Sequence, residues 1–218
     1  MKKEVIKFIE DNKLIAICRG IYGDKLVELV NTLYEGGIKL VEVTFDQNDE
    51  NCIKNTSEAI ELLASKFQGK VKIGAGTVIT EEQVIAAKNS GAEYILSPNV
   101  DLEIIKMANK RGLVTIPGAM TPTEIISAHK SGADFVKLFP AGTLGLSYAK
   151  DLLGPINNVK FIATAGITPE NLYDFLKLGF AGAGISNYLT NKKLINEGKF
   201  EILKEHAKEL VKIANQID

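Results

Sequence analysis

One lysine lies in the middle of an otherwise apolar, strand-like run. The run reads DFVKLFP over residues 134–140, and the period of two places Lys137 on the same face as Phe135 and Phe139. The opposite face must pack on helices, so Lys137 is expected to point into the interior, where burial disfavours the ammonium and lowers its pKa. Because only the free amine attacks a ketone, this setting favours Schiff-base chemistry over a structural lysine paired with a carboxylate.

A single carboxylate occupies a comparable position in another strand-like run. The run reads LVEVTF over residues 40–45, and Glu42 alternates with Leu40 and Thr44 on one face. Beside an amine, such a carboxylate can move protons between water, a carbinolamine and a carbon acid. The alternative is a buried ion pair in which Glu42 only neutralises Lys137. We favour the catalytic role, and both can hold at different steps.

Small residues follow two later strand-like runs, in the segments TAGITP at 164–169 and GAGISN at 182–187. Glycine lets the backbone approach a ligand, and the helix N-termini beyond these segments offer free N–H groups. Glycine also serves tight packing, but its presence at both places favours a phosphate or another anion as ligand. The segment GAGT at 74–77 similarly exposes backbone and the hydroxyl of Thr77.

Composition excludes several kinds of chemistry. With only 2 His and 2 Cys, the chain cannot build a His-rich zinc site or a disulfide scaffold, and it is short of a base for a Ser-His-Asp triad. A magnesium site made of carboxylates stays open. Cys18 and Cys52 are expected to be buried, reduced thiols, as in a cytoplasmic protein.

Charge and hydropathy limit the partners. Lys and Arg total 26 against 27 Asp and Glu, spread along the chain, which argues against nucleic acid and against an anionic membrane surface. The longest apolar runs, such as Leu14–Cys18, are far shorter than the roughly 20 residues of a membrane span. The first residues, MKKE, lack the apolar core of a signal peptide.

Strand-like runs and amphipathic helical patterns alternate from one end of the chain to the other. Several helical patterns end in glycine, and two begin with Thr-Pro, at residues 121–122 and 168–169. The expected strands are Leu14–Arg19, Leu40–Phe45, Lys72–Thr77, Tyr94–Pro98, Val114–Gly118, Phe135–Phe139, Phe161–Ala165 and Gly182–Ser186. The expected helices include Lys25–Glu35, Glu81–Ser90, Leu102–Lys110 and Pro122–Lys130.

Eight strand–helix repeats without a linker predict one α/β domain over residues 1–218, a closed (β/α)₈ TIM barrel. An extra N-terminal helix, Lys2–Asn12, would cap its bottom. The alternative is a doubly wound open sheet, but RGIYGD follows the first strand instead of a GxGxxG turn. Reactive groups of such barrels gather at the C-terminal strand ends, here occupied by Arg19, Glu42, Thr44, Thr77, Ser97, Lys137, Thr164 and Ser186.

These motifs, as an ordered set over nearly the whole chain, resemble the family of 2-keto-3-deoxy-6-phosphogluconate (KDPG) and 4-hydroxy-2-oxoglutarate (KHG) aldolases. The segments that carry the resemblance are RG at 19–20, GGI at 36–38, VEVT at 41–44, GAGTV at 74–78, SP at 97–98, IPG at 116–118, TPTE at 121–124, VKLFPA at 136–141, GP at 154–155 and TAGI at 164–167.

The resemblance implies a class I aldolase without cofactor or metal, a cytoplasmic homotrimer that makes or breaks a carbon–carbon bond next to pyruvate. Under it, Lys137 forms the imine and Glu42 is the general acid and base. Thr77, with Pro98 nearby, helps to hold the pyruvyl carboxylate. The resemblance also implies that Gly166 and Ser186 bind the distal phosphate. It places Arg19 and Phe139 in the lining of the same pocket.

Two positions depart from the family pattern. Many members carry an arginine four residues after the catalytic glutamate, where this chain has Asp46, and a carboxylate there would repel the substrate if it pointed inward. Either Thr77, backbone amides and Arg19 suffice, or the segment Asp46–Glu50 turns away. The family's Gly-Gly pair after the seventh strand is Ala165-Gly166, whose added methyl suits only a negative φ.

Three functions are compatible with these residues. The first is a Schiff-base aldolase acting on KDPG or a close 2-keto-3-deoxy acid, with glyceraldehyde 3-phosphate as the aldehyde. The second is a phosphate-binding barrel isomerase or epimerase in which Lys137 is only electrostatic. The third is a barrel that binds a sugar acid without turnover, an idea motivated by Asp46.

Overall fold

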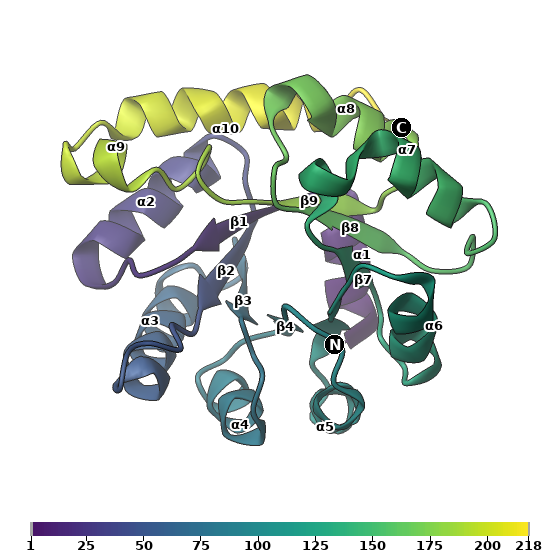
Figure 1. Ribbon diagram of the computed structural model, residues 1–218. Coiled ribbons are helices and arrows are strands. Elements are labelled where there is room, and N and C mark those ends of the chain that lie inside the picture. The colour runs from purple at the N-terminus through teal and green to yellow at the C-terminus, as the bar shows by residue number, and fades with distance from the viewer. Residues whose placement is uncertain (1, 218) are drawn as a thin grey trace.

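The computed structural model describes residues 2–217, which form nine parallel strand segments and ten helices (Figure 1). Strands and helices alternate except that β6 follows β5 directly and α10 follows α9. The strand segments are β1 (Leu14–Cys18), β2 (Leu40–Thr44), β3 (Lys72–Gly76), β4 (Tyr94–Leu96), β5 (Val114–Ile116), β6 (Gly118–Ala119), β7 (Val136–Leu138), β8 (Phe161–Thr164) and β9 (Gly182–Ile185). The helices are α1 (Lys2–Asn12), α2 (Gly23–Glu35), α3 (Cys52–Lys66), α4 (Glu81–Asn89), α5 (Leu102–Lys110), α6 (Pro122–Lys130), α7 (Ala141–Leu153), α8 (Pro169–Lys177), α9 (Lys192–Asn196) and α10 (Phe200–Ala214).

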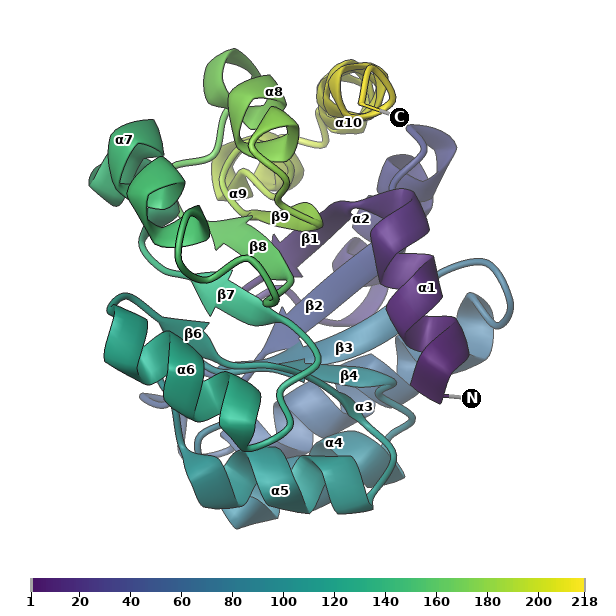
Figure 2. The same cartoon turned by 90° about the vertical axis from the view of Figure 1, so that its right-hand side faces the viewer.

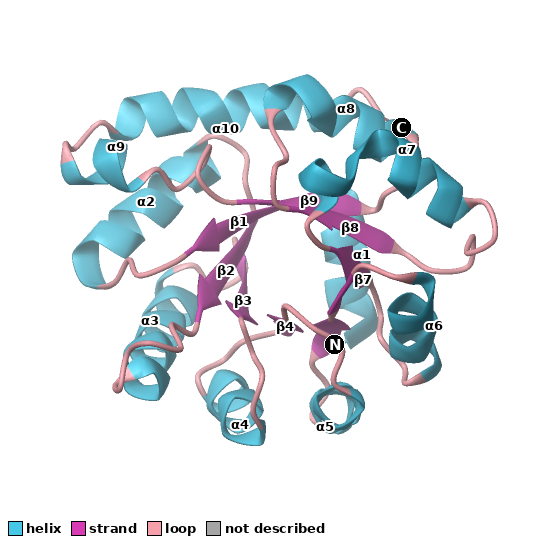
Figure 3. Ribbon diagram, viewed as in Figure 1, coloured by secondary structure: helices cyan, strands magenta, loops and turns pink. Residues whose placement is uncertain are grey.

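The strands form one sheet in the order β5-β4-β3-β2-β1-β9-β8-β7-β6, and every pairing is parallel. β5 and β6 are two halves of the expected strand Val114–Gly118, interrupted at Pro117, which has no N–H to donate. β5 pairs with β4 and β6 with β7, so this divided strand closes the sheet. The helices surround the strands, and the predicted (β/α)₈ barrel is confirmed (Figure 3).

Alternation along each strand separates two cores. Ile15, Leu40 and Phe135 belong to the cluster inside the barrel, whereas Val41 and Val43 belong to the larger cluster under the outer helices. The inward face expected for Phe135 and Leu40 is therefore confirmed, and it is the face on which Lys137 and Glu42 follow.

Helix α1 lies across the end of the barrel where the strands begin, as Figure 2 shows. Its buried residues Val5 and Ile9 join the inner cluster, which closes the bottom of the barrel as expected. The opposite end, at the carboxyl ends of the strands, is left for a site.

Local signals for helix ends are also confirmed. Thr121 and Thr168 begin capping boxes with Pro in the first turn, and Gly91 and Gly132 adopt φ of 95° and 89° just after helices. The cysteines are free, but only Cys18 is buried. The expected burial of Cys52 is wrong, because this residue is half-buried at the start of α3. No helix within residues 2–217 is long and apolar enough to cross a membrane.

Candidate active site

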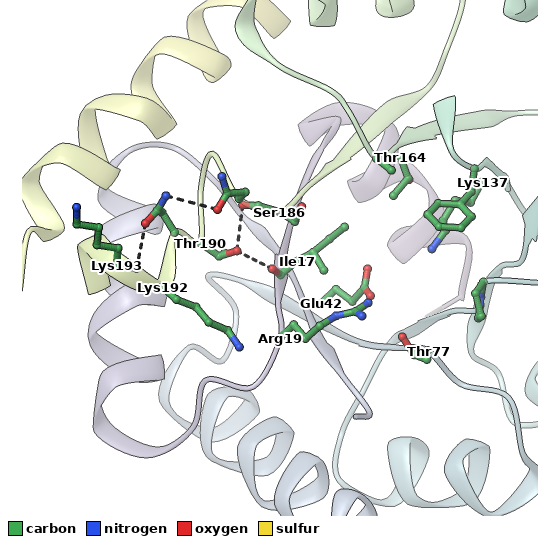
Figure 4. Close-up of a pocket in the computed structure, with 15 residues that line it drawn as sticks. Ile17, Arg19, Glu42, Thr77, Lys137, Thr164, Ser186, Thr190, Lys192 and Lys193 are labelled. Atoms are coloured by element: carbon green, nitrogen blue, oxygen red, sulfur yellow. Dashed lines mark hydrogen bonds between the residues drawn. The ribbon is translucent and has the colours of Figure 1, made fainter. Parts of the chain in front are cut away.

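A cavity of about 580 Å³ opens at the carboxyl ends of the strands (Figure 4). It is lined by seven of the eight residues that the family resemblance assigns to catalysis or substrate binding: Arg19, Glu42, Thr77, Pro98, Lys137, Phe139 and Ser186. It is also lined by Ile17, Thr164, Ala165, Asn187, Thr190, Asn191, Lys192 and Lys193. The eighth residue, Gly166, lines an adjoining cavity that shares Ala165, Ser186, Asn187 and Asn191 with the first.

Lys137 lies at the centre of β7 with only 7% of its surface exposed. Its backbone N–H donates to the Pro117 carbonyl at 2.8 Å, which fixes the strand against the divided one. Its Nζ lies 5.0 Å from the centroid of the Phe139 ring. Burial lowers the pKa of Lys137, Arg19 lowers it further and Glu42 opposes the shift. The free amine is therefore more available near neutral pH than that of an exposed lysine.

Glu42 lies on β2 and is 2% exposed. Its Oε1 lies over the backbone of Gly76, where a Cβ would be 1.7 Å from it, so only glycine leaves room for this carboxyl group. Burial raises the pKa of Glu42, while Lys137 and Arg19 lower it. Within residues 2–217, Oε2 of Glu42 and Oγ1 of Thr164 are buried without a hydrogen-bond partner, although both residues line the cavity. These two unpaired oxygens remain available to a polar ligand in the cavity.

Burial shifts both pKa values in the direction of the uncharged forms. Desolvation is the largest cause for both Lys137 and Glu42, and it exceeds their mutual attraction. A neutral amine next to a carboxylic acid provides both a nucleophile and a proton donor. The pair can therefore attack a carbonyl carbon and protonate its oxygen.

Thr77 follows β3 with a left-handed φ of 56°. Gln47 donates to the Thr77 carbonyl at 3.2 Å and accepts at 3.1 Å from the buried Gln83. Gln83 in turn accepts from the backbone N–H of Ile79 at 2.7 Å and of Thr80 at 3.2 Å. Sequence reasoning missed both glutamines, although Gln83 lies three residues after Thr80, the spacing of a capping box.

The segments after β8 and β9 form the small-residue side of the cavity. Ala165 and Gly166 both adopt φ of 71°. The methyl group of Ala165 thus lies on a left-handed backbone, the conformation in which it is strained. The Gly166 carbonyl accepts from Asn171 at 2.8 Å, and the Ala165 carbonyl accepts from the N–H of Gly142 at 2.8 Å. These bonds hold the turn in place.

Asp46 does not line the cavity. Its carboxylate accepts from the N–H of Asn48 at 3.1 Å, and its carbonyl accepts from the N–H of Asp49 at 3.0 Å. Of the two possibilities raised by the sequence, the structure shows the second, in which the segment turns away. The strand-end residue Thr44 also lies outside the cavity, donating to the Cys18 carbonyl at 3.4 Å.

Sequence reasoning missed the loop that continues from Ser186 to Lys193. Thr190 is buried and its hydroxyl lies 2.9 Å from the Ile17 carbonyl and 3.0 Å from that of Ser186. Asn191 caps α9 by accepting from the N–H of Lys193 at 3.0 Å. The signal available in the sequence was Asn191 before two lysines, at the start of a helix.

The part of the chain from residue 2 to 217 holds no cluster of three or more His, Cys, Asp or Glu side chains arranged to bind a metal ion. The cavity contains one carboxylate, Glu42, and neither histidine.

The chain matches one known protein family over most of its length. A family model of KDPG and KHG aldolases matches residues 5–205. The chain belongs to this family. The aldolase is 34% identical over 177 residues to the 2-dehydro-3-deoxy-6-phosphogalactonate aldolase of Escherichia coli, covering 81% of this chain and 83% of that one. It is 29% identical to the 2-dehydro-3-deoxy-phosphogluconate aldolase of Haemophilus influenzae, covering 97% of both.

Solved structures of similar aldolases have the same fold. A native KDPGal structure has a TM-score of 0.84 and 31% identity, over 94% of this chain and 95% of that one. The KDPG aldolase of Legionella pneumophila, with pyruvate captured as a covalent carbinolamine, has a TM-score of 0.83 and 27% identity over 94% and 97% of the two chains. The resemblance seen in the sequence and the expected enzyme class, a carbon–carbon lyase, are confirmed.

Proposed function

We propose that this aldolase reversibly cleaves KDPG, or a close 2-keto-3-deoxy acid, to pyruvate and glyceraldehyde 3-phosphate through an imine on Lys137. The single observation that supports this most is the burial of one lysine and one glutamate in the same cavity with their pKa values shifted toward the neutral forms. Neither the isomerase nor the binding function requires a nucleophilic amine there.

The reaction begins when the Lys137 amine attacks the 2-keto carbon. The carbinolamine takes a proton from Glu42 at its hydroxyl and loses water to give the protonated imine. Glu42, now a carboxylate, removes the proton of the C4 hydroxyl. The C3–C4 bond breaks, its electron pair passes to the imine as an enamine, and the aldehyde leaves. Glu42 then protonates C3, which regenerates the protonated imine. Water hydrolyses it to pyruvate and the free amine, and the released proton returns to Glu42.

The remaining residues bind the two ends of the substrate. Thr77 and Pro98 hold the pyruvyl carboxylate, because they line the cavity next to Glu42 and the Thr77 backbone is fixed by Gln47. Ser186 and Gly166 bind the distal phosphate through the exposed backbone after β8 and β9. Arg19 and Phe139 form the walls between them.

The expected homotrimer and cytoplasmic location complete the proposal. The free thiols Cys18 and Cys52 are compatible with a reducing compartment. Sedimentation equilibrium at several protein concentrations tests the assembly, and a mass other than three chains contradicts it.

Borohydride reduction in the presence of pyruvate, followed by peptide mass mapping, tests the mechanism. We expect a pyruvyl adduct on Lys137 in the parent protein and no adduct or turnover in Lys137→Ala. A folded Lys137→Ala variant that keeps more than a few per cent of the activity would remove Lys137 from the mechanism. Absence of an adduct under conditions that label a control aldolase would favour the isomerase or binding function.

A further inference from the structure

The cavity carries a positive charge that the proposed catalytic machinery does not use. Lys192, the first residue of α9, lines the cavity together with Arg19, Ser186 and Asn187. Figure 4 shows its side chain extending toward Arg19, whereas the side chain of Lys193, which also borders the cavity, points away from Arg19.

The position of this lysine is fixed by the strands beneath it. The buried Thr190 hydroxyl lies 2.9 Å from the Ile17 carbonyl oxygen and 3.0 Å from the Ser186 carbonyl oxygen. These contacts hold the loop against β1 and the end of β9. The Asn191 side chain caps α9, and its amide nitrogen donates to the side-chain oxygen of Asn187 at 3.4 Å. Its neighbour Lys192 is thereby held over the cavity instead of on a free loop.

Lys192 also fits closely over the segment that follows β1. A Cβ on Gly20 would lie 3.1 Å from the Lys192 Nζ, so the ammonium rests against this glycine, directly after Arg19. Within residues 2–217, neither Lys192 nor Arg19 forms an ion pair. Lys192 and Arg19 therefore place two cations in a cavity lined by a single carboxylate, that of Glu42, whose pKa Arg19 lowers.

We propose that Lys192 is a specificity-determining residue that binds the phosphate monoester of the acceptor aldehyde, on the Arg19 side of Ser186. The order β1-β9-β8 places Ser186 between the Arg19 side and Ala165, so an anion at the Ser186 backbone lies within the field of Lys192. The inference deepens the proposed function and rests on it for the identity of the reaction.

Aldol addition with two acceptors tests the role in turnover. Pyruvate is combined with D-glyceraldehyde 3-phosphate or with D-glyceraldehyde, using the parent protein, Lys192→Gln and the control Lys193→Gln. We expect Lys192→Gln to raise KM for the phosphorylated acceptor about five- to tenfold, a charge-assisted contact reduced by solvent exposure. The kcat/KM for D-glyceraldehyde stays within twofold, and Lys193→Gln changes neither acceptor by more than twofold.

A binding measurement separates this inference from the proposed function. Calorimetric titration with sn-glycerol 3-phosphate, which cannot react, is expected to show a Kd five- to tenfold higher for Lys192→Gln than for the parent or Lys193→Gln. A pyruvate adduct with no change in this Kd would overturn the role of Lys192 alone. Equal weakening by both lysine variants would also overturn it, since that result indicates diffuse charge attraction. Loss of the adduct with the Kd difference retained would overturn only the aldolase proposal.

Discussion

Glu42 raises the pKa of Lys137, and Lys137 lowers the pKa of Glu42, so removing one group shifts the pKa of the other in a direction that can be measured. The Glu42 carboxylate raises the pKa of Lys137, although burial lowers it more. Replacement of Glu42 by Gln removes the opposing effect, so the pKa of Lys137 falls further. We expect the pH midpoint of imine formation with pyruvate to move to lower pH in Glu42→Gln, as measured by borohydride trapping across pH.

The same substitution separates acid–base catalysis from charge compensation. Without a proton acceptor, exchange of the pyruvate methyl protons is expected to slow about 10²–10⁴-fold in Glu42→Gln, followed by NMR in deuterated water. Glu42→Asp, which keeps a shorter carboxyl group, should recover part of the rate. Unchanged exchange in Glu42→Gln would reduce Glu42 to an ion-pair partner.

At the scale of elements, the β2–α3 connection positions Thr77, which follows β3, through the side chain of Gln47 outside the cavity. Gln47→Ala removes the 3.2 Å bond to the Thr77 carbonyl and leaves a backbone with φ of 56° less constrained. We expect the KM for pyruvate to rise about three- to tenfold with a smaller change in kcat. Initial rates measure this split, and Asn48→Ala on the same turn is the control. A loss of kcat alone would contradict a positioning role in binding.

The turn that begins at Asp46 is expected to be independent of substrate binding. Because the carboxylate of Asp46 bonds to the N–H of Asn48 and lies outside the cavity, Asp46→Arg should leave the KM for pyruvate within twofold. Asp46→Asn, which keeps an oxygen for the turn, is the matched control. A fivefold or greater fall in KM for Asp46→Arg would show that a side chain at this position reaches the substrate.

At the scale of the whole molecule, stability and catalysis belong to opposite ends of the barrel. Ile9 on α1 is fully buried in the inner cluster at the bottom, whereas Lys137 and Glu42 face the upper cavity. Ile9→Ala is expected to lower the free energy of unfolding by about 2–5 kcal/mol, measured in urea. The rate of imine trapping at low temperature should stay unchanged. A parallel loss of trapping in folded protein would mean that the two ends are coupled.

Local patterns determined most of the fold. Alternation in LVEVTF and DFVKLFP placed Glu42 and Lys137 on inward faces, and Thr-Pro and glycine marked helix ends, because these signals depend on neighbours along the chain. The division of one strand at Pro117 was not predicted, since the break serves closure of the sheet and depends on β4 and β7 together.

The site required tertiary structure wherever its parts come from distant segments. The sequence by itself supplied Lys137, Glu42 and the small residues at 164–166, because each is unusual in its own strand or turn. Only packing of the strands determined that Asp46 turns away, that Gln83 supports Thr77 through Gln47, and that Lys192 extends over Gly20. Contacts between segments far apart in sequence leave no periodic signal, and barrel closure alone brings them together.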